Sequence, residues 1–336
     1  MPEGHTIHRL AGELNRRFAG IPVRALSPQG RFDDGARRID GATFGTADAD
    51  GKHLLVSFGP DRWVHVHLGL YGRVAFGVFG PAAAAKAAAA THSPYLGRDI
   101  AYLSGTAAAA RDPAAGPAVA GGAVTPGPGV DPDDDEDQDV ADPAETGSDG
   151  PPPPRGAVRL RLIGDGDYLD LRGPTACELL SDAELKVLTA RLGPDPLRRD
   201  GRVAEFVRRV RKSRTDVGAL VMDQKVVAGI GNVYRAELLY RHRVSPFRSG
   251  RDMDEPTLAA MWDDLKVLMR AGVKTGQIVT TRPADRDRPR RRPVPRSDAH
   301  YVYKRAGQPC RVCGTEVLTR VMVGRNLFWC PYCQAC

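Results

Sequence analysis

Four cysteines near the C-terminal end constrain the fold of this chain more than any other feature. They form two Cys-x2-Cys pairs, Cys310 with Cys313 and Cys330 with Cys333, separated by sixteen residues. Four thiolates at this spacing are typical of a structural zinc site in which each pair forms one knuckle. A unit this small cannot be stable on its own apolar core, so we expect one tightly held structural zinc per chain.

The segment between the pairs, EVLTRVMVGRNLFW, predicts a hairpin whose turn holds Gly324, Arg325 and Asn326. Two cysteines remain. We expect Cys177 to be a packed thiol. Cys336 could replace a zinc ligand, but the spacing favours Cys333.

Charge is distributed unevenly along the 336 residues. Residues 80–156 hold four basic and twelve acidic residues, a net charge of −8, so the rest of the chain carries +15 and the total is +7. A body this basic favours a polyanionic partner, nucleic acid first. The stretch 80–156 is rich in Ala, Gly, Pro and Asp and has little to bury, so we interpret it as a mostly disordered insertion.

Hydrophobic periodicity predicts an α+β fold. Apolar residues at helical spacing predict a helix from Glu3 to Phe18. Alternating patterns around Val64–Leu68 and Arg159–Leu162 predict antiparallel strands of a β-sandwich with one buried face.

From about Ala176 the pattern becomes helical, beginning with ELLSDAELKVL and continuing to about residue 274. RPADRDRPRRRPVPR then indicates an exposed basic linker. We divide the chain into a sandwich domain (1–174), a helical domain (175–280), the linker (281–300) and a zinc finger (301–336).

Two local features are ambiguous by themselves. Gly229 and Gly231 precede a helix that begins near Asn232, and the start of that helix could bind an anion such as a phosphate. Composition alone favours an ordinary helical hairpin with a glycine-rich turn. His65 and His67 share one strand face and could bind a metal, but no third ligand is evident, so we do not predict a site there.

A set of ordered motifs closely resembles the formamidopyrimidine-DNA glycosylase/endonuclease VIII family. It covers nearly the whole chain except residues 80–156 and the linker. The start MPEG, LYG after His67, and GRNLFWCPYCQ favour the endonuclease VIII branch. The motifs are MPEG, GKHLL (51–55), HLGLYG (67–72), RLGPDPL (191–197), DQKVVAGIGNVYRAELL (223–239) and the terminal ribbon.

The resemblance implies roles for single residues. After removal of the initiator Met, the Pro2 amine would be the nucleophile, and Glu3 would move protons at the sugar and the leaving groups. Lys52 would contact phosphate and assist elimination, and Arg325 would clamp phosphates around the lesion. Asn232 and Arg191 would contact the DNA backbone.

The resemblance implies a bifunctional glycosylase and AP lyase of base excision repair. The enzyme would flip a damaged base out of the duplex, form a Schiff base, and cut the strand by β- and δ-elimination. The partner would be double-stranded DNA with damaged bases or abasic sites. We expect a cytoplasmic monomer with no membrane association, and zinc as its only cofactor, with a purely structural role.

The lesion class depends on a short loop. Leu70 and Tyr71 resemble the endonuclease VIII residues that fill the gap left by a flipped base, which favours oxidised pyrimidines. An oxidised-purine glycosylase of the sister branch and a non-catalytic zinc-ribbon DNA-binding protein remain as alternatives. His5, Thr6 and Gly69 depart from the residues common in the family, so the lesion contacts from those positions stay open.

Overall fold

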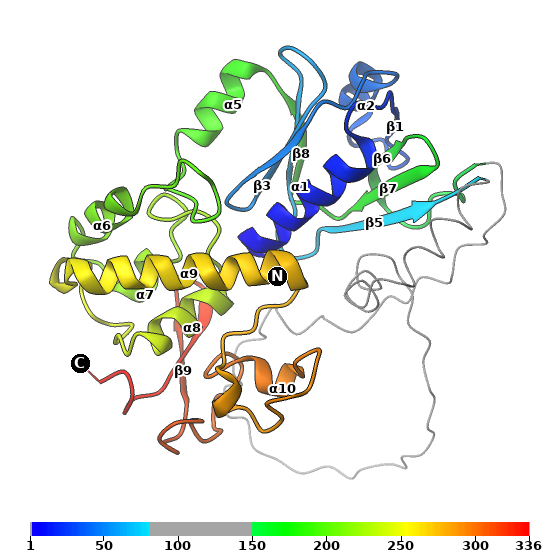
Figure 1. Ribbon diagram of the computed structural model, residues 1–336. Coiled ribbons are helices and arrows are strands. Elements are labelled where there is room, and N and C mark those ends of the chain that lie inside the picture. Colours follow the sequence, from blue (N-terminus) through cyan, green and yellow to red (C-terminus); the bar gives the residue numbers. More distant parts are fainter. Residues whose placement is uncertain (1, 81–149, 336) are drawn as a thin grey trace, which may run out of the picture.

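Two packed sheets and a long helix form the N-terminal half of the molecule. The computed structural model describes residues 2–80 and 150–335, and most of the expected insertion therefore lies outside the described residues. Figure 1 shows the sandwich on one side and the helical unit on the other. The elements of this half are α1 (Gly4–Phe18), β1 (Arg24–Leu26), α2 (Asp33–Ile39), β2 (Ala47–Asp50), β3 (His53–Ser57), β4 (Trp63–His67), β5 (Arg73–Val78), β6 (Val158–Ile163), β7 (Asp167–Arg172) and β8 (Ala176–Leu180).

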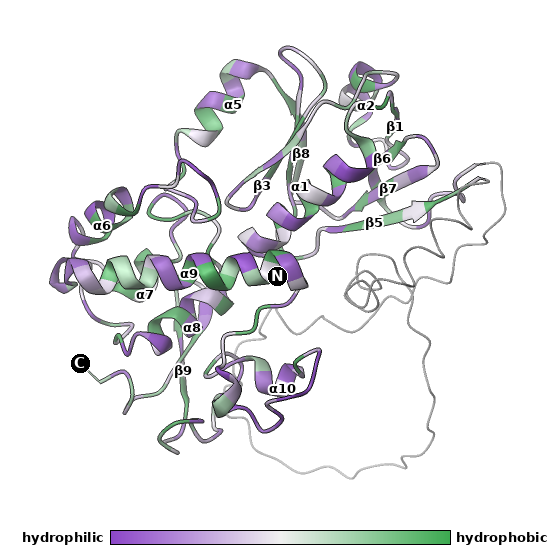
Figure 2. Ribbon diagram, viewed as in Figure 1, coloured by the Kyte–Doolittle hydropathy of each residue, from purple (hydrophilic) through white to green (hydrophobic). Residues whose placement is uncertain are grey.

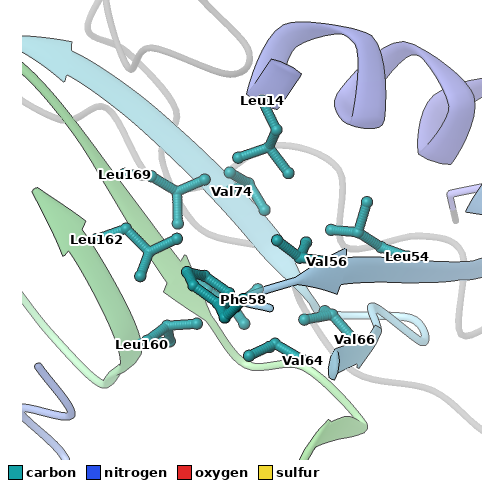
Figure 3. Close-up of a pocket in the computed structure, with 11 residues that line it drawn as sticks. Leu14, Leu54, Val56, Phe58, Val64, Val66, Val74, Leu160, Leu162 and Leu169 are labelled. Carbon is teal, nitrogen blue, oxygen red and sulfur yellow. The ribbon is translucent and has the colours of Figure 1, made fainter. Parts of the chain in front are cut away.

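Both sheets are antiparallel and four-stranded, in the orders β1-β6-β7-β5 and β2-β3-β4-β8. Apolar side chains from the two inner faces pack together with the buried face of α1, where Ile7, Leu10 and Leu14 recur at helical spacing. Figure 3 shows the narrow space between the sheets, lined only by apolar side chains such as Leu14, Phe58 and Leu162. This space is core rather than a ligand site, because it offers no polar group.

The expected helix across ELLSDAELKVL is wrong in its first part. Ala176–Leu180 is strand β8, which pairs with β4 from Trp63↔Leu180 to His67↔Ala176. The helix starts later, at Asp182, where Ser181 and Glu184 form a capping box. In so short an apolar run the spacing of hydrophobic residues fits a helix and a strand equally, so pairing with β4 determines its conformation. The sandwich thus takes its last strand from beyond residue 174.

In the β1-β6-β7-β5 sheet, the face that points away from the sandwich core is also partly covered. Arg161 alternates with the core residues Leu160 and Leu162, yet it is also buried and donates two hydrogen bonds to the Asp170 carboxylate, at 2.6 and 2.7 Å. Its Nη1 atom donates to the carbonyl of Pro152. A bidentate pair of this kind compensates the desolvation of both charges.

The C-terminal half is a helical unit followed by the zinc finger. Val217, Ile230, Leu238 and Trp262 belong to its separate core. No helix of the described residues is long and apolar enough to cross a membrane. The elements are α5 (Asp182–Thr189), α6 (Val203–Arg211), α7 (Val217–Leu220), α8 (Asn232–Arg241), η1 (Gly250–Asp252), α9 (Glu255–Thr275), η2 (Pro283–Asp285), α10 (Arg296–Ala299), β9 (Leu318–Met322) and β10 (Arg325–Trp329).

Glu237 on α8 fastens the zinc finger to the helical unit. Its fully buried carboxylate accepts hydrogen bonds from the backbone amides of Tyr301, Val302 and Tyr303, each at 2.8 Å. The hydroxyl of Thr280 donates to the same carboxylate. Four donors replace the water that the buried charge loses, so the contact is both strong and specific.

The Glu237→Gln substitution should destabilise the protein while keeping the side-chain shape. The amide has one acceptor oxygen and brings its own donors toward the Tyr301–Tyr303 amides, so we expect a loss of about 2 kcal/mol. Urea unfolding of the zinc-loaded chain measures this loss. The matched control is Glu255→Gln, an exposed side chain at the start of α9, where we expect little change. An equally small effect at Glu237 would contradict the fastening role.

Candidate active site and zinc centre

The Glu3 side chain lies against the N-terminal end of α8. Its carboxylate accepts hydrogen bonds from the amides of Gly231 and Val233, both at 2.8 Å, and a longer one from Tyr234 at 3.5 Å. Glu3 is 1% exposed and precedes α1 directly. The positive end of the α8 dipole favours a carboxylate there. Half-buried Pro2 is therefore held beside the start of α8.

Two glycines permit this close approach. A Cβ atom on Gly231 would lie 2.4 Å from the Glu3 carboxyl carbon. Gly51 has a positive φ of 59°, and a Cβ atom there would lie 2.8 Å from the Ala228 Cβ atom. Only glycine fits either position without moving the backbone. At the candidate site, the missing side chains of these two glycines therefore allow the sandwich and the helical unit to come into close contact.

Lys52 follows Gly51 on the turn between β2 and β3, within electrostatic range of Glu3 and Arg325. Burial lowers the pKa of Lys52, and the Arg325 cation lowers it further, while Glu3 opposes both. Burial raises the pKa of Glu3, against the opposing effects of Lys52 and the two α8 amides. Burial therefore shifts both groups toward their neutral forms, and the attraction between them opposes each shift.

Asp195 holds the turn that carries Lys52, and the sequence patterns did not single it out. Its buried carboxylate accepts hydrogen bonds from the amides of Gly51 at 2.8 Å and Leu197 at 2.7 Å. The His8 Nε2 atom lies 2.7 Å from the same carboxylate. The one available signal was an acidic residue between two prolines in RLGPDPL.

The zinc-finger hairpin is joined to α8 beside Arg325. Asn232 donates from Nδ2 to the carbonyl of Asn326 at 3.0 Å. Buried Arg235 donates to the carbonyls of Met322 at 3.1 Å and Asn326 at 3.3 Å, and also to Asn232 Oδ1. Burial lowers the pKa of Arg235 to about 10, which leaves it charged at neutral pH. These bonds on either side of Arg325 position it.

The hairpin turn is one residue earlier than expected. Val323 and Gly324 both have positive φ angles, and Arg325 and Asn326 begin β10. Asn232 was expected to hold a DNA phosphate; its side chain contacts the hairpin instead, and the phosphate contact stays a prediction. Arg235, which the sequence reasoning missed, carries most of this junction.

The other expected DNA contacts lie apart from this cluster. Leu70 and Tyr71 are in the turn between β4 and β5, where Tyr71 is 60% exposed. Arg191 is exposed beyond the end of α5. Their roles stay predictions. His5 is buried with its ring edge-on to Tyr234, so it is a packing residue in this structure.

His65 has two partners on the face of the second sheet. Its ring nitrogens lie 2.8 Å from Glu178 Oε1 and 2.8 Å from His53 Nδ1. The only group of three or more potential metal ligands within residues 2–80 and 150–335 is formed by cysteines. His65 and His67 are not part of that group.

That group consists of the four expected cysteines. Their sulfur atoms all lie within 4.8 Å of one another, with 3.9 Å between Cys310 and Cys333 and 3.5 Å between Cys313 and Cys330. Four sulfur donors in this arrangement fit one tetrahedral zinc ion. Cys177 packs against the sandwich core, where burial raises its pKa to about 12, and Cys336 lies outside the described residues.

Three regions of the chain match known protein families. Residues 1–113 match the formamidopyrimidine-DNA glycosylase N-terminal domain, 192–283 match the corresponding H2TH domain, and 307–335 match the zinc finger found in FPG and IleRS. The chain is 40% identical over 334 residues to Endonuclease 8 1 of Mycobacterium tuberculosis, covering 99% of this chain and 100% of that protein. The chain belongs to the formamidopyrimidine-DNA glycosylase/endonuclease VIII family.

Two further members of the family are also similar to this chain. Formamidopyrimidine-DNA glycosylase of Thermus thermophilus is 36% identical over 181 residues, covering 54% of this chain and 62% of that protein. Lactococcus lactis Fpg, solved with abasic-site DNA, has the same fold, with a TM-score of 0.65 and 17% identity over 99% of this chain and 100% of that one. As a member of this family, the protein is a DNA glycosylase with AP lyase activity.

One zinc ion per chain should be found by metal analysis of the purified protein. Cys330→Ser removes one of the four thiolates, so we expect loss of the zinc and of the folded finger. The matched control is Cys177→Ser, which should keep the zinc because Cys177 lies in the sandwich. Active protein without zinc would contradict the assignment.

Proposed function

We propose that this protein excises oxidised pyrimidines from double-stranded DNA and then cuts the strand at the resulting abasic site. The observation that carries the proposal is the convergence of Pro2, Glu3, Lys52 and Arg325 at the N-terminal end of α8. A nucleophile, a proton donor and acceptor, and two phosphate-binding cations are the groups that this chemistry requires.

Pro2 is the proposed nucleophile once the initiator Met is removed. An α-amine has a pKa of ~7.7–8.0, against ~10.4 for lysine, so far more of it is unprotonated near neutral pH. The adjacent positive end of α8 disfavours its ammonium form further. A secondary amine also forms a cationic iminium, which withdraws electrons from the neighbouring carbon.

The proposed reaction begins when the Pro2 nitrogen bonds to C1′ and the bond from C1′ to the base breaks. The amine proton leaves with the base. Glu3 donates a proton to the ring oxygen O4′, the C1′–O4′ bond breaks, and the iminium forms. Burial raises the pKa of Glu3, which is the direction of shift that a proton donor requires.

Two eliminations follow. Loss of a proton from C2′ breaks the bond from C3′ to its phosphate, and loss of a proton from C4′ breaks the bond from C5′ to the other phosphate. Water hydrolyses the remaining iminium and restores the Pro2 amine. Lys52 and Arg325 would hold the departing phosphates through their positive charges.

The rest of the proposal concerns how the chain meets DNA. The sandwich (1–174) would carry the nucleophile. The helical domain (175–280) would contact the DNA backbone through Asn232 and Arg191. The linker (281–300) leads to the zinc finger (301–336), which would present Arg325 to the DNA. Leu70 and Tyr71 would enter the gap left by the flipped base. We expect a monomer that works in the cytoplasm on the chromosome.

Borohydride trapping on abasic DNA tests the nucleophile. We expect Pro2→Gly and an N-terminally extended protein to lose most of the covalent complex, because the reactive amine is weakened or blocked, while DNA binding survives. The control carries the same extension at the C-terminus and should trap normally. Normal cleavage by a protein without a free Pro2 amine would exclude this mechanism, because another group would then have to supply the nucleophile.

A panel of defined lesions tests the substrate class. Leu70→Ala should slow excision of thymine glycol from duplex DNA by about tenfold, equivalent to ~1.4 kcal/mol, because unstacking costs a few kcal/mol. Cleavage of a preformed abasic site, which needs less extrusion, should change less. The control is Val267→Ala on the exposed face of α9. Faster excision of 8-oxoguanine opposite cytosine than of any oxidised pyrimidine would assign the protein to the sister branch.

A further inference from the structure

The segment between α9 and the zinc finger is a fixed loop rather than a simple linker. We call residues 282–296 the arginine loop. They contain seven arginines and two aspartates, a net charge of +5. The loop contains η2 and leads into α10, which Figure 1 shows below the C-terminal end of α9, and in Figure 2 this region is predominantly hydrophilic.

The neck of the loop is closed by hydrogen bonds. The Thr280 amide donates to the carbonyl of Ala299 at 2.9 Å, and the Thr281 hydroxyl donates to the carbonyl of Asp298 at 2.6 Å. The Arg282 amide donates to the Tyr301 hydroxyl at 2.9 Å. These bonds restrict the conformations of the loop, so its charges are displayed from a defined position.

Both acidic residues inside the loop are engaged elsewhere. The Tyr301 hydroxyl donates to Asp285 at 2.6 Å, and Arg311 of the first zinc knuckle lies 3.5 Å from Asp287. Arg288, Arg290, Arg291 and Arg292 are exposed and form no ion pair with any described residue. These four arginines therefore present a concentrated positive charge that no ion pair with a described residue neutralises.

The loop is also close to the candidate active site. Thr280 at its neck and Tyr301 beyond it both donate to Glu237 on α8, and the first residues of the same helix hold Glu3. Glu237 lies roughly 9 Å along the helix from Gly231, at 1.5 Å per residue. That distance is well within one turn of a DNA duplex, ~34 Å.

We propose that the arginine loop binds backbone phosphates of the duplex beside the lesion. The proposal rests on the proposed function, because it takes the DNA held at Glu3 as the ligand. Guanidinium groups suit phosphate oxygens, and several exposed arginines on a closed loop provide affinity without reading sequence. The loop thus extends the DNA contact beyond the damaged nucleotide.

The test is a full-length variant with Arg288, Arg290, Arg291 and Arg292 all changed to Gln. The probe is a duplex containing a reduced abasic site, which cannot form a Schiff base. Each phosphate contact contributes ~0.9 to the slope of log affinity against log salt, so we expect the slope to decrease in magnitude by about 2 to 4. A probe trimmed to one helical turn centred on the lesion should keep most of the difference between variant and wild type, because the phosphates beside the lesion are still present.

The matched control changes four exposed arginines at the far end of the sandwich, Arg24, Arg31, Arg37 and Arg38, to Gln. It removes the same charge, and we expect a much smaller change in slope. An unchanged slope in the loop variant, a tighter complex, or an equal effect in the control would overturn the proposal. Borohydride trapping by the wild-type protein is measured in parallel: failure to trap refutes the proposed function, whereas trapping with an unchanged slope refutes only the loop contact.

Discussion

The contact between the Glu3 carboxylate and the amides at the start of α8 determines how the two halves of this molecule meet. It joins residues more than two hundred positions apart and buries a charge that would be costly without its hydrogen bonds. The α8 amides lack partners within their own helix, and the carboxylate satisfies them. Any arrangement that separated these groups would leave both unsatisfied. The N-terminus is therefore held at one position relative to the helical unit.

One ten-residue helix organises the rest of the site. At its start α8 binds Glu3, through Arg235 it holds the hairpin on both sides of Arg325, and through Glu237 it fastens the zinc finger. Because these polar contacts are buried and share one rigid element, a displacement at one of them disturbs the others. Zinc keeps the finger folded, and α8 gives the finger its orientation.

The site also concentrates positive charge before any DNA is present. Lys52 and Arg325 repel each other, and burial disfavours the charge on Lys52, which lowers its pKa. A phosphate placed between the two cations would relieve the repulsion and favour their charged forms.

Local patterns in the sequence accounted for much of the fold. The period of apolar residues predicted α1, alternation predicted β4 and β6, and the cysteine spacing predicted the zinc centre. These features depend on residues close together in the chain, or on a ligand chemistry that the spacing itself reveals. Family resemblance, rather than periodicity, singled out Pro2, Glu3, Lys52 and Arg325.

The features that the sequence did not reveal depend on partners distant in the chain. Ala176–Leu180 is a strand because it pairs with β4. Arg161 is buried because the Asp170 carboxylate accepts its hydrogen bonds. Asp195 holds the Lys52 turn through a backbone amide, and Arg235 holds the hairpin through backbone carbonyls. Backbone groups are the same in every residue, so the sequence does not show which of them will be bound. The sequence by itself determined which chemical groups the protein carries. Only the tertiary structure decided their positions, because hydrogen bonds to backbone amides and carbonyls depend on where the chain passes and not on which residue passes there.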